Sequence, residues 1–155
     1  MIMKTKFFIL LFIILIINKM ADYEENFDPL FHDMAHLEDS DFDSNGSLNA
    51  FKGKHVVVMV FATWCGPCKR FKSDQAKLNK KYKNDSKVAV AVINGSGKTT
   101  LESEQKLMKK LREIIPNFQG FPTIALFGPD GKLCGTHEGK RTAEDVENTL
   151  KKYMN

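Results

Sequence analysis

Apolar residues fall into short unbroken runs and into helix-spaced series over most of the chain. The runs His55–Ala62 and Val88–Ile93 are rich in Val and too short for helices, so they predict central buried strands. Thr123–Phe127 and Lys132–Thr136 flank the turn residues of Gly128–Gly131, a pattern that predicts a hairpin. Four strands of one sheet are therefore expected.

Three helix-spaced series separate or follow these strands. The first places five residues on one face: Cys68, Phe71, Gln75, Leu78 and Tyr82. The second opens at the capping box Thr99-x-x-Glu102, ends before Pro116 and has four apolar residues on one face: Leu101, Met108, Leu111 and Ile115. The third opens at Thr142-x-x-Asp145 and carries Val146, Leu150 and Tyr153. This order of elements predicts an α/β fold with a mixed central sheet and helices on both faces.

The segment before residue 46 has its own pattern. Apolar residues at spacings of three and four predict a short amphipathic helix that begins near Asp28 and caps the domain: Phe27, Leu30, Phe31, Met34 and Leu37. Asp43–Gly46 has turn chemistry and marks the domain entrance. Since 155 residues suffice for one core, we expect a signal peptide or membrane anchor at 1–20, an acidic extension at 21–45 and one domain at 46–155.

The run Phe7–Ile17 is wholly apolar and follows Lys4 and Lys6, which is the layout of a secretory signal. A comfortable membrane span needs about 20 residues, so the run is short for an anchor. No good small-x-small cleavage site follows it, and an uncleaved anchor therefore stays open. We expect a protein of the secretory pathway, or one associated with a membrane through residues 7–17 with its domain extracytoplasmic. A start at Met20 would instead give a cytoplasmic protein.

Charge is divided between two parts of the chain. Residues 20–51 hold nine acids and no Lys or Arg, whereas the chain from Lys52 onward holds 20 bases and 10 acids. The acidic arm packs against the basic domain, or both surfaces are simply solvated. Nucleic-acid binding is not indicated, because the lysines interleave with apolar helix positions and accompany no recognition motif.

Cys65 and Cys68 stand three residues apart where the first helix is expected to start. This spacing allows a disulfide within one turn. The unpaired amides and the positive end of the helix dipole favour the thiolate of Cys65, which we interpret as the nucleophile. Cys68 lies deeper in the turn and is the resolving thiol, while Pro67 stiffens the ring without losing a helix hydrogen bond.

The run Phe61–Lys69, with Trp64 before Cys65-Gly66-Pro67-Cys68, resembles the active-site motif of the thioredoxin family. Gly120-Phe121-Pro122-Thr123 is similar to that family's cis-proline loop, and Gly131 and Gly139 fall at its later glycine positions. The resemblance covers about residues 46–155. It implies that Trp64, Gly66, Pro67 and Pro122 support the active site. It also implies that five residues contact the substrate: Trp64, Phe121, Pro122, Thr123 and Gly139.

The resemblance implies a monomeric thiol-disulfide oxidoreductase that reduces protein disulfides through the Cys65/Cys68 dithiol. It would need an external reductase or electron donor, and no bound cofactor or metal. The alternative is a redox-inert or zinc-binding adaptor of the same fold, because Cys65, Cys68, Cys134 and His137 match a zinc ligand count. Against zinc, Cys134 is expected to be a buried strand residue and His137 a surface residue.

The sequence departs from the thioredoxin pattern at three positions. Met59 stands where the family has a buried acid, Val92 where it has the accompanying lysine, and Ser73 where it has a helix-kinking proline. Without the acid, we expect proton removal from Cys68 to depend on water or substrate.

Two stretches that flank the strands, and one glycine-rich run, also resemble known motifs. Leu48–Lys54 and Gly128–Lys132 are similar to tryparedoxin, nucleoredoxin and the membrane-anchored bacterial thioredoxins. Gly95-Ser96-Gly97-Lys98-Thr99 lacks the earlier glycine of a phosphate loop, so we interpret it as a capped helix start.

Overall fold

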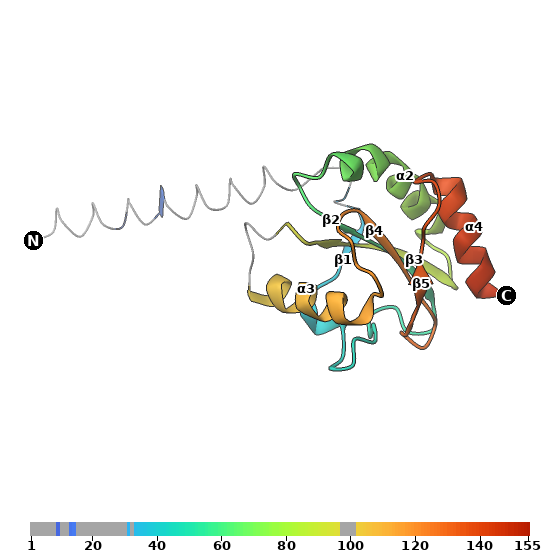
Figure 1. Cartoon of the computed structure of the whole chain (residues 1–155), viewed down its shortest axis with the longest axis horizontal. Coiled ribbons are helices and arrows are strands. Elements are labelled where there is room, and N and C mark those ends of the chain that lie inside the picture. The colour runs from blue at the N-terminus through green and yellow to red at the C-terminus, as the bar shows by residue number, and fades with distance from the viewer. Residues whose placement is uncertain (1–8, 10–12, 15–30, 32, 97–101) are drawn as a thin grey trace, which may run out of the picture.

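The computed structural model describes residues 9, 13–14, 31, 33–96 and 102–155. Five strands form one sheet in the order β1-β3-β2-β4-β5. The strands are β1 Ala35–His36, β2 His55–Phe61, β3 Val88–Asn94, β4 Thr123–Phe127 and β5 Leu133–Thr136. The α-helices are α2 Gly66–Tyr82, α3 Glu102–Ile114 and α4 Ala143–Met154, and a short 3-10 helix, η2, spans Asp39–Asp41. Helices α2 and α4 cover one face of the sheet and α3 covers the other (Figure 1).

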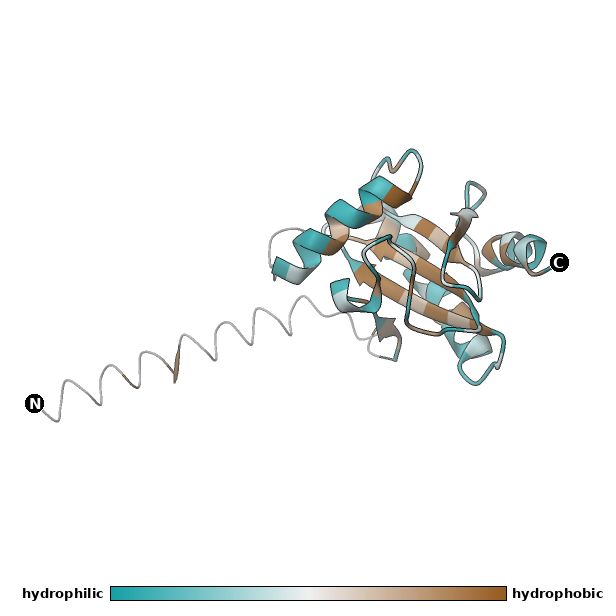
Figure 2. Ribbon diagram, turned by 90° about the horizontal axis from the view of Figure 1, so that it is seen from below, coloured by the Kyte–Doolittle hydropathy of each residue, from teal (hydrophilic) through white to brown (hydrophobic). Residues whose placement is uncertain are grey.

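The centre of the sheet is the predicted βαβ unit. β2 pairs in parallel with β3 over its full length and antiparallel with β4, which in turn pairs antiparallel with β5. Because β2 and β3 have helices on both sides, both of their faces are buried, which explains their continuous Val-rich sequences. Figure 2 shows these apolar strands between helices whose outer faces are hydrophilic. The predicted α/β class is confirmed.

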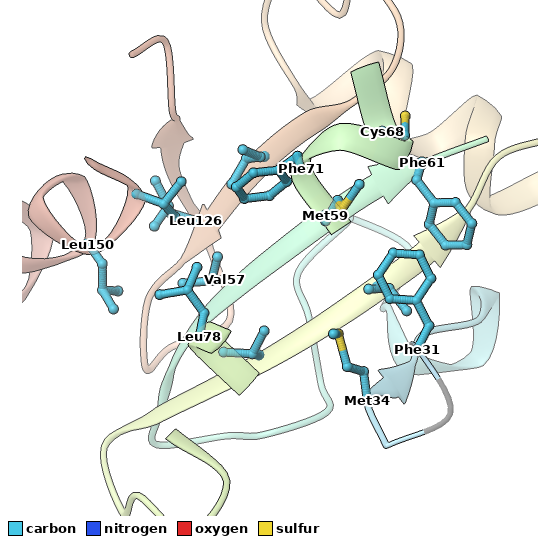
Figure 3. Close-up of a cluster of buried hydrophobic side chains, with 14 of the residues drawn as sticks. Phe31, Met34, Val57, Met59, Phe61, Cys68, Phe71, Leu78, Leu126 and Leu150 are labelled. Carbon is cyan, nitrogen blue, oxygen red and sulfur yellow. The ribbon is translucent and has the colours of Figure 1, made fainter. Parts of the chain in front are cut away.

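Alternate residues of β2 enter two separate hydrophobic cores. Val57, Met59 and Phe61 face the core under α2 and α4, where Phe71 of α2 and Leu150 of α4 pack (Figure 3). The intervening valines of β2 face the core under α3. Cys68 belongs to the first core, so α2 is held in place by the packing of its own apolar face.

The predicted N-terminal helix is wrong where the structure can be compared with it. Ala35–His36 form β1, which pairs in parallel with β3, and Leu37 N donates to Val92 O at 3.0 Å. Met34 and Leu37 are buried as expected, but from a strand edge and its flanking turns. The earlier part of that prediction, residues 27–30, lies outside the described residues. The sheet thus includes residues that precede position 46.

The two flanking stretches singled out in the sequence contact each other at the end of the sheet away from the cysteines. Leu48 N donates to Gly131 O at 2.7 Å, and Gly53 N donates to Pro129 O at 2.9 Å. Gly131 has φ +80°, and a Cβ there would overlap the carbonyl of Leu48. This position therefore requires glycine.

Within the described residues, no helix has the length and apolar character needed to cross a membrane. The apolar run at 7–17 lies mostly outside that part of the chain, as does the capping residue Thr99 expected before α3.

Candidate active site

The two cysteines lie where β2 turns into α2. Cys65 is the N-cap of α2, with extended backbone angles of φ −80° and ψ 112°, and Pro67 lies in the first turn. Cys65 N donates to Ala62 O at 3.0 Å, which closes the turn between strand and helix. The first helical turn leaves amide groups without intrahelical partners, and the amide of Cys68 is the one that donates to the Cys65 sulfur.

Cys65 and Cys68 form a disulfide, with their Cα atoms 5.2 Å apart. Cys68 N donates to Cys65 Sγ at 3.1 Å, and both residues are buried. In the reduced pair, this N–H group and the positive end of α2 favour the thiolate of Cys65 over its thiol. The geometry suits a pair that alternates between dithiol and disulfide. The assignment of Cys65 as nucleophile and Cys68 as resolving thiol stays a prediction.

Trp64, directly before the cysteine pair, is 61% exposed. Its indole Nε1 donates to Ser96 O at 3.3 Å, and its ring meets the ring of Phe121 edge-on with centroids 5.7 Å apart. A Cβ on Gly95 would lie 2.6 Å from Cε1 of Phe121, so the absent side chain leaves room for this ring. Trp64 is thus an exposed aromatic surface fixed on two sides.

The peptide bond between Phe121 and Pro122 is cis, as the sequence resemblance implies. Thr123 Oγ1 donates to Gly120 O at 2.6 Å and closes the loop locally. β4 runs antiparallel to β2 and Thr123 pairs with Val60, so the loop lies at the sheet edge where β2 ends before Cys65. Topology therefore brings the proline loop and the cysteine turn to one edge.

A groove of about 500 Å³ opens beside the proline loop. Its walls come from the segment between α3 and β4, the start of β4, the end of β5 and the segment after β5, and include Asn117, Phe121, Pro122, Thr123, Glu138 and Arg141. Three of the predicted substrate contacts line this groove. Gly139 does not line it: a Cβ there would approach Asp145 and His137 instead.

The buried positions beneath the cysteines are apolar. Met59 and Val92 are register partners on β2 and β3, and both are fully buried. No acid or lysine therefore occupies this strand pair. Ser73, where thioredoxins have a kinking proline, is exposed, and α2 continues through it to Tyr82.

The predicted environments of Cys134 and His137 are wrong. Cys134 is an exposed free thiol on β5, and partial desolvation, with a smaller contribution from Asp130, raises its pKa. The His137 side chain is only 2% exposed, because the segment after β5 places it against α4, where its Nδ1 lies 2.8 Å from Thr149 Oγ1. The alternation of buried and exposed residues along a strand does not predict the burial of either residue. Cys134 lies on β5, an edge strand, and His137 lies beyond the end of that strand. No group of three or more candidate metal ligands occurs in the described part of the chain.

A sheet of this order, with a Cys-x-x-Cys pair capping its first long helix and a cis-proline loop beside it, defines a redox protein of thioredoxin fold. The family model described as Thioredoxin matches residues 33–152, and the chain belongs to the thioredoxin family.

Individual relatives agree with this assignment. Protein disulfide-isomerase 2-3 of Arabidopsis thaliana is 32% identical over 91 residues, which are 59% of this chain and 18% of that protein. Thioredoxin-like protein YneN of Bacillus subtilis is 27% identical over 120 residues, 67% of this chain and 68% of that protein. The first thioredoxin domain of mouse protein disulfide-isomerase A4 superposes with a TM-score of 0.58 at 22% identity. That match covers 79% of this chain and 76% of the domain, and it shows the shared fold. The chain spans less than a fifth of the matched isomerase 2-3.

Family and cysteine pair together support thiol-disulfide exchange as the chemistry of the site. The likeness of the flanking stretches to tryparedoxin and its relatives stays a prediction.

Proposed function

We propose that the protein reduces disulfide bonds of protein substrates through Cys65 and Cys68. The thiolate of Cys65 attacks one sulfur of the substrate disulfide, which forms a mixed disulfide and releases one substrate thiolate. Cys68 loses its proton and attacks Cys65 Sγ, which releases the second substrate thiolate and forms the Cys65–Cys68 disulfide. Two electrons pass from the dithiol to the substrate. The observation that carries this proposal is the Cys68 N–H group on Cys65 Sγ at a helix N-terminus.

An external dithiol reductase or electron donor then restores the pair. It transfers two electrons to the Cys65–Cys68 disulfide by the same exchange in the opposite sense. The Gly-Pro dipeptide between the cysteines is the reason for proposing reduction as the direction, because it resembles the reducing members of the family.

Substrate docking is proposed at the edge that carries Trp64 and the cis-proline loop. Trp64 offers a rigid apolar surface next to the cysteine pair, and backbone groups at Phe121 and Thr123 pair with an extended substrate segment. The groove beyond Pro122 accepts the continuation of that segment.

The apolar pair Met59 and Val92 gives this exchange a distinctive proton requirement. Among the described residues no carboxylate is buried beneath Cys68, so its proton must leave to water or to the departing substrate thiolate. We therefore propose slower or more pH-dependent resolution than in thioredoxins that hold the buried acid.

The site of action is proposed to be the secretory pathway or the outer side of a membrane, on account of the apolar run at 7–17 and its flanking lysines. Sequencing the mature N-terminus and separating membrane from soluble fractions would test this. A soluble protein that begins at Met20 would contradict it.

Catalysed reduction of a disulfide-bonded protein by dithiothreitol tests the proposed function. The unaltered protein should accelerate the reduction, Cys65→Ser should abolish the acceleration, and Cys134→Ser should retain it, because that thiol lies on β5 outside the active-site turn. No acceleration by the unaltered protein, or full activity of Cys65→Ser, would refute the proposal.

A further inference from the structure

We propose that Ser96 is a positioning residue of the active site, which fixes Thr63 and Trp64 and through them the approach to Cys65. Only the expected change in substrate kinetics rests on the proposed function; the expected ordering of Trp64 does not. Ser96 lies two residues beyond the end of β3 and is 8% exposed. It belongs to the glycine-rich run that lacks the pattern of a phosphate loop.

The Ser96 hydroxyl contacts three groups. Thr63 N donates to Ser96 Oγ at 2.9 Å, Thr63 Oγ1 lies 3.2 Å away, and Asn94 Oδ1 lies in close contact. Asn94 Oδ1 also accepts from Ser96 N at 3.1 Å, so it is an acceptor and takes the Ser96 hydroxyl proton. The Thr63 hydroxyl must then donate to Ser96 Oγ. The one donor and both acceptor positions of Ser96 Oγ are thereby used.

The backbone of Ser96 adds a second contact to the same loop. Its carbonyl accepts from the indole Nε1 of Trp64 at 3.3 Å, while Phe121 meets the indole ring from another element. Ser96 therefore connects Thr63 and Trp64, the two residues before Cys65, to the end of β3. Thr63 and Ser96 are 33 residues apart in the sequence. Its side chain holds Thr63, and its main chain holds Trp64.

An exposed aromatic residue binds a partner more tightly when it is already ordered, because less side-chain entropy is lost on binding. Trp64 is more than half exposed, so its order depends on these few contacts. Loss of the Ser96 hydroxyl would leave Thr63 N and Asn94 Oδ1 without this shared partner in a nearly buried place. The expected consequence is a looser Trp64 and weaker docking of large substrates, with the sulfur chemistry unchanged.

The variant Ser96→Ala tests this. Trp64 is the single tryptophan of the chain, so fluorescence anisotropy and acrylamide quenching report on this residue alone. We expect lower anisotropy and faster quenching. KM for a disulfide-bonded protein should rise about three- to tenfold, the range that follows from losing about one hydrogen bond. Turnover of a small aromatic disulfide should change less than about twofold. Ser96→Thr, which keeps the hydroxyl, should recover the anisotropy.

Ser73→Ala, on the exposed side of α2, is the matched control and should match the unaltered protein in every measurement. Thr63→Val keeps the backbone donor and removes only the hydroxyl, so it should shift anisotropy in the same direction by a smaller amount. If Ser96→Ala does not fold, Thr63→Val with unchanged anisotropy and quenching overturns the proposal.

Unchanged fluorescence and KM in folded Ser96→Ala also overturn it, as does an equal loss of kcat on both substrates without a fluorescence change. If the unaltered protein lacks turnover altogether, the proposed reductase function fails. The fluorescence measurements then still decide whether Ser96 orders Trp64.

Discussion

Replacing Glu147 by Gln is expected to remove an acid-sensitive contact between α4 and the C-terminal end of α2. Glu147 Oε1 and Oε2 each accept from Lys81 at 2.7 Å, Tyr82 Oη donates to Oε1 at 3.0 Å, and Lys151 Nζ lies 2.9 Å from Oε1. Hydrogen bonds from Lys81 and then Lys151 lower the pKa of Glu147 from 4.5 to about 2. The carboxylate thus stabilises the fold above the unfolded-state pKa.

The size of the effect follows from that pKa change. A fall from 4.5 to about 2 corresponds to roughly 3 kcal/mol, at about 1.4 kcal/mol for each tenfold change in proton affinity. The Lys81 and Lys151 side chains are 56% and 60% exposed, so solvent screens both pairs. We therefore expect about 1–2 kcal/mol at neutral pH, lost as pH falls from about 4.5 toward 2.

Urea unfolding of the unaltered protein and Glu147→Gln at pH 7 and pH 2.5 measures this difference. Gln keeps the shape and one acceptor for Tyr82, so the comparison isolates the charge. Glu113→Gln is the matched control, because Glu113 is exposed on α3 and has no ion-pair partner among the residues that the structure describes. A stability difference that is equal at both pH values, or no larger than that of Glu113→Gln, would refute the reasoning.

Two further substitutions have definite expected outcomes. Met59→Asp places a carboxyl beneath Cys68 next to Val92, where burial raises its pKa, and should add a titration step to the pH profile of disulfide reduction. An unchanged profile in the folded variant would show that the missing acid does not limit resolution. Gly131→Ala forces a side chain into a backbone with φ +80° against the carbonyl of Leu48, and should cost about 1–3 kcal/mol in thermal unfolding. A loss below about 0.5 kcal/mol would mean that the loop relaxes freely.

The sequence predicted the central strands well because β2 and β3 are buried on both faces and therefore consist of continuous apolar runs. The cap of α4 could also be predicted: Thr142 Oγ1 accepts from Asp145 N at 3.2 Å, as the spacing of these two residues indicated. Both signals are local.

Errors arose where distant segments decide the outcome. Phe31, Met34 and Leu37 have helical spacing, but the open edge of β3 offers Ala35 and His36 a parallel partner that the spacing does not reveal. His137 is buried because α4 covers it, which no local pattern shows.

The contacts of Ser96 could not be predicted either. They require the ends of β2 and β3 to lie side by side, and the only signal in the sequence was a cluster of polar residues directly after a buried strand.

Trapping the mixed disulfide tests the central claim most directly. Cys68→Ser, mixed with a disulfide-bonded protein and analysed without reductant, should accumulate a covalent adduct that maps to Cys65 and disappears with dithiothreitol. Adduct formation by Cys65→Ser through Cys68, with none from Cys68→Ser, would contradict the assigned roles, and the absence of adducts from both would contradict the exchange mechanism itself.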